Sequence, residues 1–186
     1  SESRLLMALK ATIFKAEVQI SDMDRHYYEI HHLTLAKHPS ETDERMMTRL
    51  LAFAMFAHQE LYFTRGISSI DEPDLWQKSL SNEIELWIEL GQPDARRLGK
   101  ACGRSQQVQV VCYGGRNAEL WWDKIKGDLQ RFDNLSILNI PEETVKTLTK
   151  LVNRNMHLQC LIEDKVIWLT SGAKMIEIKP EYWLQA

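Results

Sequence analysis

The sequence predicts a mixed α/β fold, with strands and helices following one another along the chain. Three stretches support this prediction. Residues 82–91 place an apolar side chain at every second position, Ile84, Leu86, Ile88 and Leu90, which is the period-two pattern of a β-strand. Residues 40–61 repeat apolar side chains every three or four positions, which is typical of a helix with one buried face. Residues 93–140 alternate between helical and strand-like segments, which favours a partly parallel central sheet with helices packed on it.

The N-terminal elements follow from residue patterning and turn residues. Residues 11–20 are rich in residues that favour strands, and residues 26–35 form a second such segment after a polar turn, so we expect an N-terminal β-hairpin. Ser40 is the predicted N-cap of the long helix, with Asp43 at the third helical position as in a capping box. A loop is expected over residues 66–71.

The C-terminal half is predicted from proline, glycine and short apolar runs. A proline followed by acidic residues, as at Pro141, is typical of a helix start. Glycines at 114–115 precede another helix. The expected order is helix 93–104, strand 108–112, helix 115–126, strand 135–140, a helix from 141, and closing strands at 157–162, 166–170 and 175–179.

Length and composition fit a single globular domain. The chain has 186 residues, of which 44% are hydrophobic and 26% charged. A chain of this length buries about 70% of the surface that it exposes when unfolded, so it needs no disulfide or structural metal to fold. We expect one domain over residues 7–186. Met7 is a natural start, and residues 1–6 are interpreted as upstream or vector residues.

Charge and cysteine usage exclude some classes of protein. The net charge is −3, so the chain is not one that coats nucleic acid indiscriminately, and any contact with nucleic acid must use a local basic patch. Three widely spaced cysteines without a C-x-x-C motif indicate reduced thiols. The longest apolar run, residues 50–57, is far shorter than the roughly 20 residues that span a bilayer. We therefore expect a cytoplasmic protein without a membrane partner.

Two acids, Asp74 and Glu89, are predicted to lie side by side. If residues 75–88 form a hairpin that turns at Ser81–Asn82, counting outward from the turn places Asp74 opposite Glu89. Opposed side chains have Cβ atoms about 4.5–5.5 Å apart, so the carboxylates repel each other and one shifts toward protonation unless a cation lies between them. Magnesium or manganese, which prefer oxygen ligands, would suit such a pair.

A basic helix face follows this acidic pair in the sequence. The predicted helix over residues 93–104 carries four cations along one side: Arg96, Arg97, Lys100 and Arg104. This face begins a few residues after Glu89 and could lie beside the acids. In phosphodiester hydrolysis, a metal held by carboxylates activates water and a nearby Lys or Arg stabilises the charge of the transition state. The combination therefore points to phosphodiester chemistry.

Four stretches of the sequence resemble the bacterial YaeQ family. They are H-P-S-E-T-D-E-R-M-M-T-R-L-L-A (His38–Ala52), F-T-R-G (Phe63–Gly66), D-E-P-D-L-W (Asp71–Trp76) and I-E-L-W-I-E-L-G-Q-P-D-A-R-R-L-G-K-A (Ile84–Ala101). The resemblance runs from about Ala8 to the C-terminus. It implies a fold similar to the PD-(D/E)XK phosphodiesterase superfamily, with a restriction-endonuclease-like core: a central mixed β-sheet flanked by helices, an N-terminal β-hairpin and C-terminal strands. The family has no settled biochemical activity.

The resemblance also implies a metal site. The superfamily motif supplies an acid after a proline and a second acid on the next strand, often joined by an acid from the preceding helix. In this sequence Asp74 takes the first position and Glu89 the second, and both would bind magnesium or manganese. Glu44 or Glu41 would be the helix acid.

The cationic part of the motif departs from the family pattern. Its lysine, two residues after the second acid, falls on Gly91. Lys100 or Arg97 from the following helix would then supply the charge. We assign a catalytic role to Lys100 and substrate binding to Arg97 and Arg104.

Each candidate also has a plain structural explanation. Glu83, Glu85 and Glu89 fit the solvent-facing side of a half-exposed strand. Glu41 and Glu44 fit the first turn of a helix, where the helix dipole favours acids by about 0.3–1 kcal/mol each. The four cations fit a solvated helix face.

Three functions remain open from the sequence. The first is a magnesium- or manganese-dependent nuclease or phosphodiesterase. The second is a catalytically inactive nuclease-like module that binds nucleic acid or a protein partner in a regulatory role, and Gly91 and the acidic net charge favour it. The third is a nucleic-acid-linked regulator that acts through the basic helix. Fold alone does not decide among them, because function belongs to the site.

Overall fold

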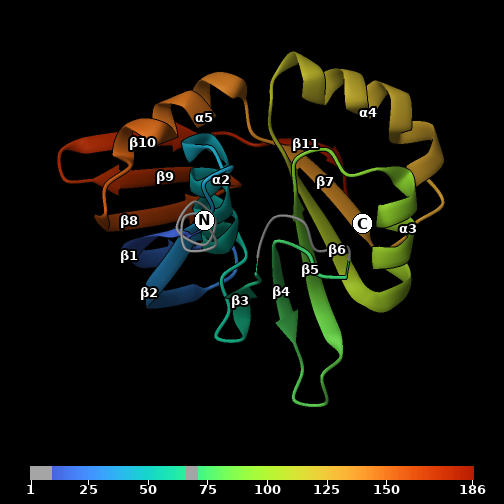
Figure 1. Cartoon of the computed structure of the whole chain (residues 1–186), viewed down its shortest axis with the longest axis horizontal. Coiled ribbons are helices and arrows are strands. Elements are labelled where there is room, and N and C mark those ends of the chain that lie inside the picture. The colour runs from blue at the N-terminus through green and yellow to red at the C-terminus, as the bar shows by residue number, and fades with distance from the viewer. Residues whose placement is uncertain (1–9, 66–70) are drawn as a thin grey trace, which may run out of the picture.

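The strands of this chain fall into two mixed sheets, which stand side by side in Figure 1 with helices packed against them. The structure is a computed structural model, and it describes residues 10–65 and 71–186. The predicted start at Met7, the segment 1–6 and most of the predicted loop at 66–71 lie outside the described residues.

The first sheet, sheet A, combines the two ends of the described chain. Its strand order is β10–β9–β8–β1–β2. The central pair, β1 and β8, is parallel, and the other neighbours are antiparallel. The bounds are β1 Thr12–Asp22, β2 Tyr27–Lys37, β8 Asn155–Glu163, β9 Val166–Ser171 and β10 Lys174–Ile178.

The second sheet, sheet B, carries the candidate acids. Its strand order is β11–β7–β6–β5–β4–β3, in which β5, β6 and β7 are parallel and the outer strands are antiparallel to their neighbours. The bounds are β3 Leu61–Phe63, β4 Leu75–Lys78, β5 Ile84–Leu90, β6 Ser105–Cys112, β7 Leu135–Asn139 and β11 Glu181–Leu184.

Sheet B separates two hydrophobic cores, each of which includes side chains from two helices. Apolar side chains of α2 and α5 pack with the inner face of sheet A and with one face of sheet B. Side chains of α3 and α4 pack on the other face of sheet B. The bounds are α2 Asp43–Met55, α3 Ala95–Arg104, α4 Arg116–Leu129, α5 Glu142–Leu148 and the 3₁₀ turn η1 Thr149–Leu151. Helix α2 therefore lies between the sheets, and its side chains reach both.

Capping residues set where the two helices nearest the site begin. The predicted cap of α2 was wrong by two residues: Thr42, not Ser40, accepts the Arg45 N–H at 3.1 Å. Ser40 instead bonds to the His38 ring at 2.8 Å, which keeps its hydroxyl away from the helix. Asp94 caps α3 by accepting the Arg97 N–H at 2.7 Å. Both caps satisfy N–H groups that have no partner within their helix.

The mixed α/β class, the N-terminal hairpin and the closing C-terminal strands are confirmed. The strands form two sheets, whereas the sequence predicted one central sheet. The division arises because β1 pairs with β8, in the register Lys15 opposite Asn155, and draws the N-terminal hairpin and the closing strands into a sheet of their own. No helix among the described residues is both long and apolar enough to cross a membrane.

Candidate functional site

Asp74 lies directly beside the strand that carries Glu89. Strand β4 pairs with β5 in the register predicted from the sequence, with Leu75 opposite Ile88. The backbone N–H of Asp74 donates to the Ile88 carbonyl at 3.0 Å, and Asp74 Oδ2 accepts the Leu90 N–H at 2.8 Å. The pairing of these strands thus brings the two acids to the same end of the hairpin, as expected.

The far end of this hairpin differs from the predicted two-residue turn at Ser81–Asn82. The N–H of Ser79 donates to the Glu83 carbonyl at 2.9 Å, and Asn82 has a positive φ of 67°. A three-residue loop that ends in a left-handed residue is a common hairpin connection. Between the pairs Gln77–Leu86 and Lys78–Ile84 the register shifts by one residue of β5, which compensates for the extra loop residue and leaves the pairing near Asp74 as predicted.

Each acid of the pair is neutralised by an arginine. Arg45, which points out from α2, forms an ion pair with Asp74 Oδ1. Arg97 of α3 donates through Nε to Glu89 Oε1 at 2.7 Å, and the Trp87 indole N–H donates to the same oxygen at 2.9 Å. The side chains of Asp74 and Glu89 are only 8% and 7% exposed. The cations beside these buried acids are therefore guanidinium groups.

The two acids also affect each other electrostatically. Burial raises the pKa of Glu89, Arg97 lowers it, and the charge of Asp74 raises it, with a net rise. Burial lowers the pKa of Arg45, but attraction to Asp74 and Glu41 outweighs this and raises the pKa overall. The raised pKa of Glu89 therefore comes first from burial, and the neighbouring carboxylate of Asp74 adds to it.

The helix acids are arranged differently from each other. Glu41 is fully engaged: it accepts Arg49 Nε at 2.7 Å and Arg49 Nη2 at 2.9 Å, and Arg45 Nη1 lies 3.2 Å away. Arg45 thus bridges Glu41 and Asp74. Burial raises the pKa of the Tyr113 phenol, and the charge of Glu44 adds to this rise after those of Asp74 and Glu41.

The carboxylate oxygens do not fit a magnesium or manganese ion in this arrangement. Both oxygens of Asp74 and of Glu41 take part in hydrogen bonds or ion pairs with N–H groups, and Glu89 Oε1 accepts two. Among residues 10–65 and 71–186, no group of three or more His, Cys, Asp or Glu side chains is placed to hold a metal ion. For Asp74 and Glu89 to bind a divalent cation, Arg45 and Arg97 would have to move away.

The motif position of the lysine has a backbone that favours glycine. Gly91 has a φ of 88°, and its N–H donates to the Val111 carbonyl at 3.0 Å. A side chain with a Cβ is strained at such a φ, so a lysine would not fit here without a change of backbone. The cation that reaches Glu89 is Arg97 instead.

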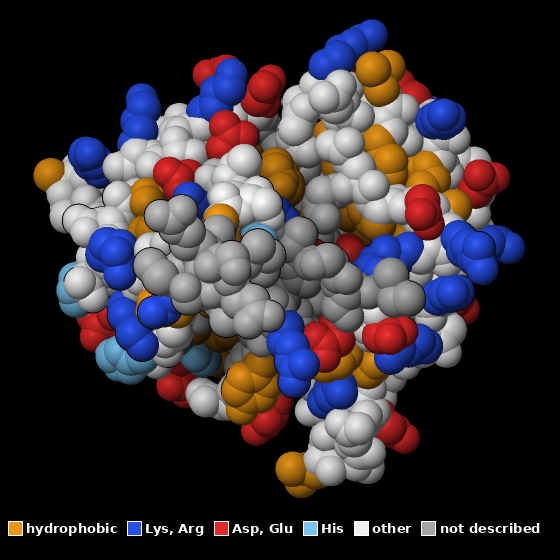
Figure 2. Space-filling model, in the orientation of Figure 1, with side chains coloured by type: hydrophobic (Ala, Val, Ile, Leu, Met, Phe, Trp, Pro, Cys, Tyr) orange, Lys and Arg blue, Asp and Glu red, His pale blue; other side chains and the backbone are white. Residues whose placement is uncertain are grey.

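The basic face of α3 lines a surface pocket next to Glu89. The pocket has a volume of about 570 Å³, and its floor includes Trp87. Figure 2 shows Lys and Arg side chains gathered on this side of the molecule. The charged residues that line it are Asp71, Asp94, Arg96, Arg97, Lys100 and Arg104.

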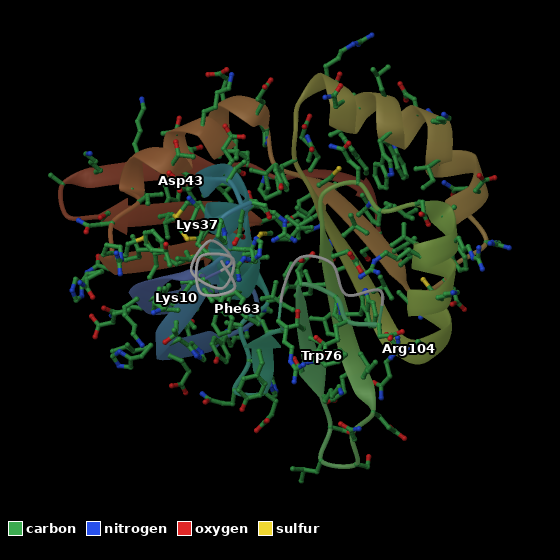
Figure 3. All side chains as sticks on the ribbon, viewed as in Figure 1. Lys10, Lys37, Asp43, Phe63, Trp76 and Arg104 are labelled. Carbon is green, nitrogen blue, oxygen red and sulfur yellow. The ribbon has the colours of Figure 1, made fainter. Side chains whose placement is uncertain are left out.

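The four cations of α3 fall into two pairs. Arg97 and Arg104 are held in place: they donate to the carbonyls of Glu72 and Asp71 at 2.8 and 3.1 Å, and both lie over the Trp87 ring. In Figure 3, Arg104 lies at the end of α3 beside the β4–β5 hairpin. The other two cations, Arg96 and Lys100, are exposed, and neither side chain forms a hydrogen bond or ion pair with any residue that the structure describes.

The arginines of α2 were not predicted at the site. Arg45 and Arg49 lie four residues apart on α2, and Glu41 lies one residue before the N-cap Thr42 and four residues before Arg45. Arg49 is only 4% exposed. Acidic and basic side chains at this spacing within an otherwise apolar helix face could have indicated a buried ion-pair network.

Three comparisons with known proteins agree with one another. The family model described as YaeQ protein matches residues 7–180. The proteins named "Uncharacterized protein YaeQ" from Escherichia coli (strain K12) and Salmonella typhi are each 44% identical over 179 residues, covering 96% of this chain and 99% of theirs.

Solved structures show the same architecture. The crystal structure of YaeQ protein from Xanthomonas axonopodis pv. citri has a TM-score of 0.92 and 44% identity, covering 95% of this chain and 99% of that one. That of YaeQ protein from Pseudomonas syringae has a TM-score of 0.90 and 34% identity, covering 95% and 97%. With sequence, family model and fold in agreement, this chain belongs to the YaeQ family.

Proposed function

We propose that this protein is a catalytically inactive, nuclease-like module that binds the phosphates of a nucleic acid through α3. One observation carries the proposal: Asp74 and Glu89 are each paired with an arginine, while Arg96 and Lys100 stand exposed in the adjacent pocket. Paired acids contribute little repulsion toward a phosphate. The exposed cations are then the groups that attract it.

The charge distribution supports local binding. The whole chain has a net charge of −3, so its overall field does not favour a polyanion. Helix α3, however, has four cations and no acid between Ala95 and Arg104. Lys and Arg that neutralise phosphates release counterions from nucleic acid, and such binding weakens as salt is added.

The test is fluorescence anisotropy with labelled single-stranded and duplex oligonucleotides over a range of salt. We expect the variant Arg96→Ala/Lys100→Ala to bind more weakly to every sequence. Its slope of log affinity against log salt should be smaller by about 1.4–1.8, which corresponds to about 0.7–0.9 for each of two lost phosphate contacts.

The matched control removes the same charge from another helix. Lys124→Ala/Lys126→Ala on α4 alters two exposed lysines and should leave the affinity and the slope close to those of the natural chain. Equal losses in the two double variants, or binding that does not respond to salt, would contradict a phosphate site on α3.

The electrostatic coupling of Asp74 with Glu89 favours a second candidate, a magnesium- or manganese-dependent phosphodiesterase. In this case a divalent cation displaces Arg45 and Arg97 from the two acids. The bound ion would activate water and neutralise phosphate charge. Metal titration separates the two candidates, because only the second requires an ion at this pair.

A further inference from the structure

Strand β2 is a long, regular strand with a free edge. It is the outermost strand of sheet A and has eleven residues. It pairs with β1 along its whole length without a bulge, from Tyr27 opposite Asp22 to Lys37 opposite Thr12. Figure 1 shows β2 at the margin of sheet A. Within the described residues, no strand pairs with its other side.

The backbone groups along this free edge can be identified. The Lys15 N–H donates to the Arg154 carbonyl at 2.8 Å, so the backbone of Lys15 faces β8. Because backbone groups alternate in direction along a strand, the neighbouring residues of β1 face β2. Their partners on β2 are Glu29, His31, Leu33 and Leu35.

The intervening residues of β2 therefore point their backbone groups away from β1. Arg49 Nη2 donates to the Ala36 carbonyl at 3.1 Å, as expected if even-numbered residues face outward. The other residues of β2 whose backbone points outward are Tyr28, Ile30, His32 and Thr34. No described residue forms a hydrogen bond with their backbone N–H or C=O groups.

This edge lacks the features by which proteins usually prevent strand pairing. Protected edges are short or bulged, or they carry proline or charged side chains. The other sheet edges are short: β3 has three residues, β10 has five, and β11 has four with an irregular register. On β2, Tyr28 and Ile30 are 52% and 55% exposed, and the four outward-facing residues carry no carboxylate, lysine or arginine.

We propose that β2 pairs antiparallel with β2 of a second copy of this chain, which joins the two copies of sheet A into one continuous sheet. An antiparallel pair of identical strands has two-fold symmetry, so every outward N–H of one copy meets a C=O of the other. Glu29 lies toward one end of β2 and Lys37 lies at the other. Lys37 already pairs with Asp43 of its own chain at 2.8 Å, so these end charges do not select the occupant. A second copy is favoured because it supplies an edge of the same eleven-residue length, and because the outward-facing residues of both edges carry no carboxylate, lysine or arginine that would repel its like.

The experiment measures molecular mass in solution by sedimentation equilibrium over a wide range of protein concentration. The natural chain should approach twice the 21.7 kDa of one chain. Ile30→Lys places a charge on the edge. His32→Pro removes an outward N–H that the fold of one chain does not use. Both variants should remain at the mass of one chain, with the circular dichroism spectrum of the natural chain.

A control on the opposite edge strand separates edge pairing from general surface effects. Met175 is 64% exposed on β10, so Met175→Lys should still form the pair. A single-chain mass for the natural chain at every concentration overturns the proposal. So does a double mass that persists in Ile30→Lys and in His32→Pro, because another surface would then hold the copies together.

Discussion

Replacing Glu41 with alanine is expected to lower the free energy of unfolding by about 3–5 kcal/mol, because it leaves a buried guanidinium without its counter-ion. Glu41 accepts two hydrogen bonds from Arg49 at 2.7 and 2.9 Å. The side chains of the two residues are 1% and 4% exposed, so water cannot replace the lost carboxylate. Arg49 also donates to the Ala36 carbonyl and lies over the Phe63 ring, so α2, β2 and β3 all depend on its position. Urea unfolding at neutral pH measures the effect.

Asp43, the first residue of α2, supplies the control. Asp43 pairs with Lys37 at 2.8 Å, but its side chain is 46% exposed, and Figure 3 shows both residues labelled. Asp43→Ala should lower the free energy of unfolding by no more than about 1 kcal/mol. If Glu41→Ala lowers the free energy of unfolding no more than Asp43→Ala does, the buried network stabilises the fold no more than an exposed ion pair.

Replacing Arg45 with methionine is expected to lower the free energy of unfolding by about 3 kcal/mol, at the lower end of the range for a broken buried pair. Asp74 then keeps the Leu90 N–H as a partner but loses its cation. The effect should be smaller than for Glu41→Ala because the Arg45 side chain is 18% exposed. Thermal and urea unfolding both report it.

The double variant Arg45→Met/Asp74→Asn tests whether the loss comes from the uncompensated charge. An amide keeps the shape of Asp74 without its charge, so the double variant should be more stable than the sum of the two single losses predicts. Additive losses would mean that Arg45 acts through packing and not through the ion pair with Asp74.

The parts of this structure that depend on neighbouring residues were predictable. The alternation over residues 82–91 located β5. Counting from the expected turn gave the right pairing of Asp74 with the strand of Glu89 only because a register shift in the hairpin offsets the longer loop. The basic side of α3 followed from helical spacing alone. These features depend on periodicity, which a single sequence displays directly.

The parts that depend on distant residues were not predictable from periodicity. The parallel pairing of β1 with β8 joins segments about 140 residues apart, and it creates a second sheet. The partners of the acids come from α2 and α3, which approach the hairpin from either side of sheet B. Because Arg45 was not expected at the site, the sequence suggested a metal ion as the cation beside the two carboxylates.

Arg45 and Arg97, and not a metal ion, neutralise Asp74 and Glu89 in this structure. Calorimetric titration of magnesium and of manganese into the purified protein tests whether a divalent cation can take their place, with Glu89→Ala alongside. We expect no binding heat beyond dilution in either protein, because the arginines already compensate the acids. Saturable binding to the natural chain that disappears in Glu89→Ala would contradict this expectation and place a divalent cation at the acid pair.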